Sequence, residues 1–253
     1  MGVLILKERR MSKLIVANWK MNGSLSKVQS DLENYNSNPV TNHSNVVLTL
    51  PMPYLSIASS FIDKQKLAAQ DVSSFDGSGA YTGEVSAVML RDLNISYALV
   101  GHSERRNILD ESDDLLIKKV ENLINHQITP IFCIGESLSV RQENEYLKFI
   151  ANQLSFLVPV LDKLSNLVIA YEPIWSIGTG VIPTNEQIAQ MMDYIHSFMQ
   201  KYANHVKIAS LYGGSVTSDN AKSILSISLV DGVLVGGASL KVNEFMAICD
   251  SSK

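Results

Sequence analysis

The sequence predicts a single α/β domain, a closed (β/α)8 barrel with parallel strands. Short apolar runs recur along the chain, and amphipathic helical stretches lie between most of them. Eight such units of roughly 30 residues match the size of a closed barrel. An open doubly wound sheet shows the same alternation, so it stays as the alternative, because periodicity does not show whether a sheet closes.

The predicted strands are continuous apolar runs rather than alternating ones. Such runs are typical of parallel strands that are buried on both faces. In chain order they cover residues 13–19, 45–51, 66–72, 96–102, 129–135, 167–173, 207–214 and 231–237.

Two helical stretches show a clear apolar face. Residues 113–127 place together Leu116, Val120, Leu123 and Ile124. Residues 184–202 follow Pro183 and carry Thr184 and Gln187 in the pattern of a helix start. Their apolar stripe consists of Ile188, Met191, Met192, Ile195 and Met199. We interpret this methionine stripe as part of the core rather than as a cofactor pocket.

Composition excludes several classes of protein. Lys and Arg number 21 against 25 Asp and Glu, and the formal net charge of -4 offers no basic field for nucleic acid. Cys133 and Cys249 are too few for a disulfide scaffold and are expected to stay thiols. No segment has the length of a membrane span or the pattern of a secretory signal, so we expect a cytoplasmic protein that binds no membrane.

The domain boundaries follow from the same pattern. No linker or shift of composition divides residues 12–253, which we assign to one catalytic barrel domain. Residues 1–11 precede the first strand and end at a second methionine, Met11. We expect them to be a poorly ordered N-terminal extension.

Polar residues and glycine turns follow the predicted strands where their carboxyl ends lie. Ligands of parallel α/β folds bind at that edge. The residues there are Asn18, Lys20, His102, Glu104, Glu172, Gly214, Ser215, Gly236 and Gly237. The set has no metal-ligand spacing, and no G-x-G-x-x-G follows a strand, so we predict neither a metal nor a dinucleotide cofactor.

Five stretches of the chain resemble the signature stretches of the triosephosphate isomerase family, in the same order and spacing. They are "ANWKMNG", "GHSERR", "YEPIWSIGTG", "YGGSV" and "LVGGASL", and "GAYTGEVSA" and "CIGE" are also similar. The resemblance extends from Ser12 to Ile248. It implies a TIM barrel that interconverts dihydroxyacetone phosphate and D-glyceraldehyde 3-phosphate through an enediolate, in glycolysis and gluconeogenesis and without a cofactor.

Glu172 is the predicted general base. A surface glutamate at a strand end is the plain alternative, but Pro173 fixes the backbone after it, and Ile174 and Trp175 are apolar neighbours. Burial beneath such side chains disfavours the charged carboxylate and raises its basicity. The resemblance implies that Glu172 moves a proton between the two carbons that carry the carbonyl and the hydroxyl.

His102 is the predicted electrophile, because an enediolate needs hydrogen-bond donors placed in advance. A lone histidine at this position is otherwise a hydrogen-bonded core residue. "SERR" predicts a helical turn directly after it, and a helix N-terminus disfavours added positive charge. We therefore expect a neutral imidazole.

Lys20 and Asn18 follow the first strand, where a lysine is ordinarily a solvated strand end. The resemblance implies that Lys20 stabilises the phosphate and the growing enediolate charge, with the Asn18 amide as a donor beside it. Glu104 is expected to pair with Lys20 and orient it.

Two glycine turns are predicted to bind the phosphate. "YGGS" and "LVGG" precede predicted helices, whose first N–H groups point outward and attract an anion. The candidates are Gly214, Ser215, Gly236 and Gly237, with Gly178 added from the loop after Glu172. Generic glycine turns are the alternative.

The stretch "PIWSIGTG" is interpreted as a lid over Glu172. Pro173, Ile174 and Trp175 form one hinge, Gly178 the tip, and Tyr212 and Ser215 the latch partners. Ser176 and Val181 depart from the family, which more often has Ala and Lys there. We expect both departures to affect lid motion rather than chemistry.

A long loop begins at Asp71 and ends at Ala87. Long loops are usually functional or disordered, and by itself the sequence predicts a flexible lid here. The resemblance instead implies a homodimer, in which this loop enters a pocket of the partner subunit and Thr82 reaches the other active site.

Two other functions stay open at the level of sequence. A different phosphate-binding barrel, such as a phosphoribosyl isomerase or synthase, explains the glycine turns but not Glu172 and His102. A non-catalytic phosphosugar-binding scaffold is expected to lose Lys20, His102 or Glu172, and all three are present.

Overall fold

The strands form a closed parallel barrel. A computed structural model of the protein describes residues 12–38, 45–62, 66–177 and 181–252. The strands are β1 (Leu14–Asn18), β2 (Asn45–Leu50), β3 (Leu67–Ala69), β4 (Tyr97–Val100), β5 (Thr129–Ile134), β6 (Asn166–Tyr171), β7 (Lys207–Tyr212) and β8 (Gly232–Val235). Each pairs with the next in chain order, and β8 returns to pair with β1. The closed barrel is confirmed and the open sheet is excluded, while the predicted extension at residues 1–11 lies outside the described residues.

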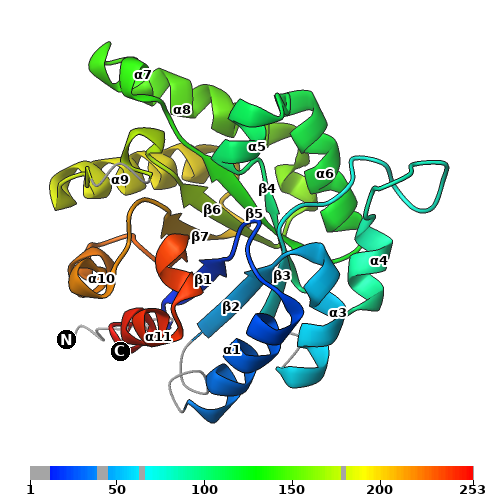
Figure 1. The fold of residues 1–253 in the computed structure, drawn as a ribbon. Coiled ribbons are helices and arrows are strands. Elements are labelled where there is room, and N and C mark those ends of the chain that lie inside the picture. Colours follow the sequence, from blue (N-terminus) through cyan, green and yellow to red (C-terminus); the bar gives the residue numbers. More distant parts are fainter. Residues whose placement is uncertain (1–11, 39–44, 63–65, 178–180, 253) are drawn as a thin grey trace, which may run out of the picture.

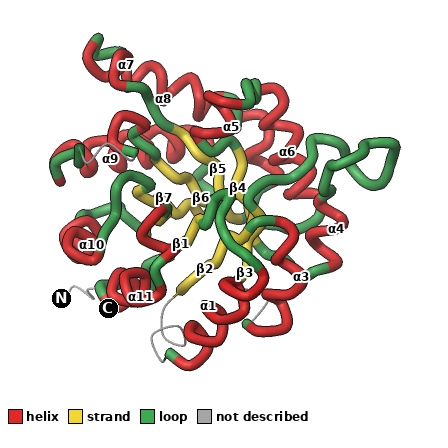
Figure 2. Tube along the Cα trace, in the orientation of Figure 1, coloured by secondary structure: helices red, strands yellow, loops and turns green. Residues whose placement is uncertain are grey.

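Helices surround the strands on all sides (Figures 1 and 2). The α-helices are α1 (Leu25–Ser37), α3 (Met52–Phe61), α4 (Ala87–Asp92), α5 (Ser103–Ile108), α6 (Asp113–Asn125), α7 (Leu138–Gln142), α8 (Tyr146–Ser155), α9 (Asn185–Tyr202), α10 (Ser218–Ser226) and α11 (Val242–Asp250). The described residues also include three short 3-10 helices, η2 (Val158–Lys163), η3 (Ile174–Ser176) and η4 (Gly237–Leu240). No helix among the described residues is long and apolar enough to cross a membrane.

Two apolar cores explain the continuous apolar runs. Inside the barrel, Val16 packs with Val47, Ile131 and other inward side chains. Ile15, the neighbour of Val16, belongs to the second core, between the strands and the helices. Because side chains of a strand point alternately to its two faces, a strand between two cores carries apolar side chains on both faces.

The two helices with predicted apolar faces form as expected. In α6, Leu116, Val120 and Leu123 are fully buried, and Ile124 packs partly buried against the same core. In α9 the whole predicted stripe is fully buried, which confirms that its methionines belong to the core. Cys133 and Cys249 are buried free thiols, as predicted.

Candidate active site

The carboxyl ends of the strands surround one cavity of about 300 Å³. Its lining includes the predicted residues Asn18, Lys20, His102, Glu172, Gly214, Ser215, Gly236 and Gly237. These residues come from five different strand ends, and the closed barrel brings them together. Glu104 joins them through its contact with Lys20. Gly178 lies outside the described residues.

Glu172 follows β6 and is almost completely buried, with 2% of its surface exposed. Its Oε1 lies 3.0 Å from His102 Nε2, and its Oε2 accepts a hydrogen bond of 3.0 Å from the Ser103 N–H. Gly135 follows β5 and lies directly against the backbone of Glu172. A Cβ built on Gly135 would be 1.8 Å from the Glu172 carbonyl oxygen. Gly135 is therefore required where the two strands meet, a role that the sequence did not reveal.

His102 caps α5 and holds a defined tautomer. Its Nδ1 accepts a hydrogen bond of 3.3 Å from the Glu104 N–H. Because this nitrogen accepts, the ring carries its proton on Nε2, which points at the Glu172 carboxylate. The predicted helix start after His102 is confirmed.

The pKa of His102 departs from the sequence-based expectation. Burial lowers this pKa, but the Glu172 carboxylate at hydrogen-bond distance and the nearby Glu104 carboxylate raise it more, and the net pKa is raised. The helix N-terminus alone predicted the opposite direction. The sequence could not show that Glu172, 70 positions away, is the direct neighbour of the ring.

Lys20 is held in an unusual backbone conformation, with φ of 52°. Few side-chain-bearing residues adopt this left-handed region. The Asn18 side chain accepts a hydrogen bond of 3.0 Å from the Lys20 N–H, and the Gln70 amide donates to the Lys20 carbonyl oxygen at 2.8 Å. The Lys20 Nζ lies 2.5 Å from Glu104 Oε1, so the predicted pairing is present. Gln70 was missed, because no motif marks it.

The two glycine turns lie on one side of the cavity. Gly236 precedes η4, and a Cβ built on it would lie 3.4 Å from Lys20 Cε, so this turn is adjacent to the lysine. A Cβ on Gly237 would meet nothing within 4 Å. Ser215 Oγ donates to the Ser176 carbonyl oxygen at 2.6 Å, which connects the β7 turn to the segment after Glu172. These turns and Lys20 offer N–H groups and a cation to an anion.

Trp175 does not act in the way that its position after Glu172 suggested. Its Nε1 donates a hydrogen bond of 3.0 Å to the fully buried Glu136, which also accepts from the Tyr171 hydroxyl at 3.0 Å. Ile177, rather than Trp175, lines the cavity next to Glu172. Ser176 is fully buried, and Val181 is 54% exposed. Glu136 follows β5 in "CIGE", and the sequence assigned it no role.

The loop at residues 71–87 extends away from the barrel between β3 and α4 (Figure 1). Thr82 is exposed, and the side chains of Phe75 and Tyr81 stack on each other with ring centroids 3.9 Å apart. At the base of the loop, the Ser73 N–H donates a hydrogen bond of 2.8 Å to the Val85 carbonyl oxygen. The loop is therefore ordered by its own contacts, at a distance from the cavity.

Among the described residues, no group of three or more His, Cys, Asp and Glu side chains is arranged to hold a metal ion. The polar side chains that line the cavity are instead one carboxylate, one imidazole, one ammonium, the Asn18 amide and two hydroxyls, and glycine turns lie beside them. Such a set can accept a proton, donate a hydrogen bond to a nearby oxygen and bind an anion.

Comparison with known proteins gives one family. A family model described as triosephosphate isomerase matches residues 13–252. A triosephosphate isomerase of Francisella tularensis subsp. mediasiatica is 41% identical over 250 residues, which cover 96% of this chain and 98% of that protein. A triosephosphate isomerase of Neisseria meningitidis serogroup A is 41% identical over 247 residues, covering 95% of this chain and 98% of that protein.

Proposed function

The chain belongs to the triosephosphate isomerase family, and from that premise we propose that Glu172, His102 and Lys20 carry out the reaction. The reaction itself is the interconversion of dihydroxyacetone phosphate and D-glyceraldehyde 3-phosphate. The protein is thus an intramolecular aldose–ketose isomerase of glycolysis. Its substrate is a small triose phosphate.

Glu172 is the general base of the proposal. Its carboxylate takes the proton from the carbon that carries the hydroxyl, and the electron pair of that C–H bond forms the carbon–carbon double bond of the enediolate. The same carboxyl group then returns the proton to the neighbouring carbon. The position of Glu172 supports this role, because its side chain is buried, lines the cavity and lies 3.0 Å from His102.

His102 is the donor to the substrate oxygens. Its Nε2–H gives a hydrogen bond to the carbonyl oxygen as negative charge develops there, gives its proton to that oxygen, and takes one from the other. The hydrogen bond from the Glu104 N–H to Nδ1 supports this role. Because Nδ1 accepts that hydrogen bond, the proton of the ring is on Nε2.

Lys20 and the two glycine turns hold the charged parts of the substrate. The ammonium of Lys20 stabilises the enediolate, and Glu104 and Asn18 fix its position. N–H groups at Ser215, Gly236 and Gly237 bind the phosphate, and Gly178 is proposed to join them. With the phosphate bound near Lys20, the same ammonium stabilises both the phosphate and the enediolate.

The single observation that carries these assignments is the contact of 3.0 Å between Glu172 and His102 in one buried site. We expect the Glu172→Gln variant to lose almost all exchange of solvent tritium into dihydroxyacetone phosphate, because an amide cannot accept the proton. Glu121→Gln, at a partly exposed position on α6 that pairs with Lys163, is the matched control and is expected to exchange normally. Continued rapid labelling by the Glu172→Gln variant would contradict the assignment.

We also propose that the protein is a homodimer joined through the loop at residues 71–87, including Thr82. The loop presents the half-exposed Phe75 and Tyr81, and Met89 of α4 and Met21 beside Lys20 are also exposed. Phe75 and Tyr81 stack on each other on this loop, and contiguous exposed apolar surface is typical of protein interfaces. Sedimentation is expected to give twice the chain mass, and a monomer at micromolar concentration would contradict the proposal.

The cytoplasm is the proposed location. The two buried free thiols, Cys133 and Cys249, accord with a reducing compartment.

A further inference from the structure

The stretch "GHSERR" contains two arginines that the proposed reaction does not use. His102 and Glu104 contact Glu172 and Lys20, and the Ser103 N–H binds the Glu172 carboxylate. All three belong to the start of α5, a helix of six residues. A helix this short is not stable on its own, so other contacts must fix its position.

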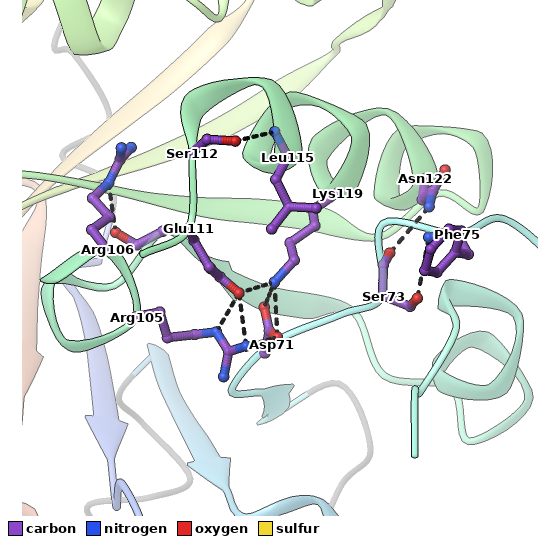
Figure 3. A network of polar contacts seen from close by, with 11 residues as sticks. Asp71, Ser73, Phe75, Arg105, Arg106, Glu111, Ser112, Leu115, Lys119 and Asn122 are labelled. Atoms are coloured by element: carbon purple, nitrogen blue, oxygen red, sulfur yellow. Dashed lines mark hydrogen bonds and ion pairs between the residues drawn. The ribbon is translucent and has the colours of Figure 1, made fainter. Parts of the chain in front are cut away.

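Arg105 fastens one side of α5 to a cluster of four charges, Asp71, Arg105, Glu111 and Lys119 (Figure 3). Its Nε and Nη2 donate to Glu111 Oε1 at 2.9 and 2.7 Å, and its Nη2 lies 2.8 Å from Asp71 Oδ2. Lys119 of α6 contacts the same two carboxylates, at 2.7 Å from Asp71 and 2.5 Å from Glu111. Arg105 thus joins α5 to the segment after β3 and to the turn between α5 and α6, and the shared carboxylates connect it to Lys119 of α6.

Arg106 fastens a second side of α5 to the barrel. Its Nε donates to the Gly101 carbonyl oxygen at 2.9 Å, and its Nη2 to that of Cys133 at 3.4 Å. Its Nη1 donates to Asp113 at 2.6 Å. The two successive arginines therefore hold one short helix from two directions.

The charge cluster depends on Arg105. Glu111 and Lys119 have side chains that are about 5% exposed or less, and buried charges are tolerated only when they are paired. Burial raises the pKa of Glu111, but Arg105 and Lys119 outweigh it, and the net pKa is lowered. Loss of the Arg105 side chain would leave two carboxylates around one ammonium, with repulsion between Asp71 and Glu111 and no side-chain bond from α5 to either carboxylate.

We propose that Arg105 is a positioning residue of the isomerase reaction, which holds α5 so that His102 and the Ser103 N–H face Glu172 and Glu104 reaches Lys20. The proposal rests on the proposed roles of Glu172, His102 and Lys20. Arg105 acts through α5 and does not line the cavity. The phosphate-binding turns after β7 and β8 are on other elements, so a displaced α5 affects turnover more than substrate binding.

The test replaces Arg105 by Gln and measures turnover, KM and the titration of His102 by NMR. We expect kcat to fall by about tenfold to a hundredfold, because small displacements of reacting groups are costly, while KM stays within about threefold. The pKa of His102 is expected to move toward its ordinary value as its contact with Glu172 lengthens. This titration reports the position of α5 independently of turnover.

Three further variants complete the experiment. Arg91→Gln removes an exposed arginine of α4 that donates to Gln127 at 3.1 Å, and it is expected to change neither kcat nor the His102 titration. Arg105→Lys keeps the charge without the forked geometry, so it should recover part of the lost turnover. Asp71→Asn removes the carboxylate charge that Arg105 contacts, so it weakens the contact between Arg105 and residue 71 and should also lower kcat.

Wild-type kcat and an unchanged His102 titration in Arg105→Gln, even with lower thermal stability, would overturn the proposal. If that variant does not fold, the same result in Arg105→Lys and Asp71→Asn overturns it. Failure of the proposed chemistry is a separate outcome, since it appears as continued isotope exchange in Glu172→Gln.

Discussion

At the scale of single residues, the Glu172 carboxylate accepts two hydrogen bonds, from His102 Nε2 and from the Ser103 N–H. Each of the two carboxylate oxygens is therefore occupied by a donor. The substrate must therefore replace at least one of these donors before Glu172 takes a proton from carbon. Since His102 must also reach the substrate oxygens, the contact between Glu172 and His102 is the one expected to open.

The pairing of Glu172 with His102 predicts a measurable titration. The folded protein raises the pKa of His102 above its ordinary value of 6.5. The contribution of the pair to stability is therefore full below pH 6.5, and it is lost as the pH rises through the folded-state pKa. Glu172→Gln removes the carboxylate and should lower the pKa of His102, as measured by NMR. An unchanged or higher pKa in this variant would contradict the assigned contact.

Lys20 provides a second prediction at this scale. Lys20→Met keeps much of the side-chain volume but removes the ammonium that pairs with Glu104 at 2.5 Å. We expect kcat/KM to fall by about 10²-fold or more, because a fixed charge beside the developing enediolate is lost. Lys163→Met, which removes an exposed lysine paired with Glu121, is the matched control. Near-normal turnover of Lys20→Met would show that Lys20 has no part in the chemistry.

Residue types at the strand ends were predictable, but their contacts were not. Lys20 and His102 stand out because a charged group or an imidazole follows an apolar run. Gln70 supports the left-handed backbone of Lys20 from another strand, and Gly135 admits the backbone of Glu172. Neither contact leaves a local pattern, because each joins positions that are far apart in the chain.

At the scale of elements, α9 shows how local signals specify a helix. Thr184 Oγ1 accepts the Gln187 N–H at 3.3 Å, and the Gln187 side chain accepts the Thr184 N–H at 2.9 Å. This reciprocal capping box satisfies two N–H groups that the helix itself leaves unpaired. The apolar stripe then selects the face that packs on the barrel.

The capping box gives a prediction for stability. Thr184→Ala removes the hydroxyl and should lower the free energy of unfolding by about 1 kcal/mol. Thr184→Ser keeps the acceptor and is expected to lie within a few tenths of a kcal/mol of the wild type. Urea unfolding measures both. Equal stability of all three proteins would mean that the cap contributes nothing.

The segment after Glu172 shows what element-scale reasoning missed. Apolar neighbours suggested that Trp175 covers the carboxylate, but the indole N–H needs an acceptor when it is buried, and Glu136 supplies it from another strand end. The type of a side chain in a short loop can be read from the sequence, but the residue that it hydrogen-bonds to depends on the fold.

At the scale of the whole molecule, the barrel closes where β8 meets β1. Gly232 pairs with Leu14 at this seam, and a Cβ built on Gly232 would lie 1.8 Å from the Leu14 carbonyl oxygen. Two strand backbones approach more closely here than a side chain allows. The seam therefore depends on a residue without a Cβ.

Substitution at this seam tests closure directly. Gly232→Ala should lower the free energy of unfolding by about 3 kcal/mol or more, because the two backbones must separate. Gly237→Ala, where an added Cβ meets nothing within 4 Å, is the matched comparison and should unfold at nearly the wild-type urea concentration. Comparable stability of the two variants would contradict a tightly closed seam.

The sequence by itself determined the order of strands and helices, the apolar faces and the types of polar residue that follow each strand, because these depend on periodicity and on neighbours along the chain. Only the tertiary structure decided that β8 closes onto β1, that Glu172 contacts His102 and Ser103, and that Arg105 binds Asp71 and Glu111. Those contacts join distant positions, and their strength depends on burial. Burial exists only once the barrel has closed and water has left the space between its elements.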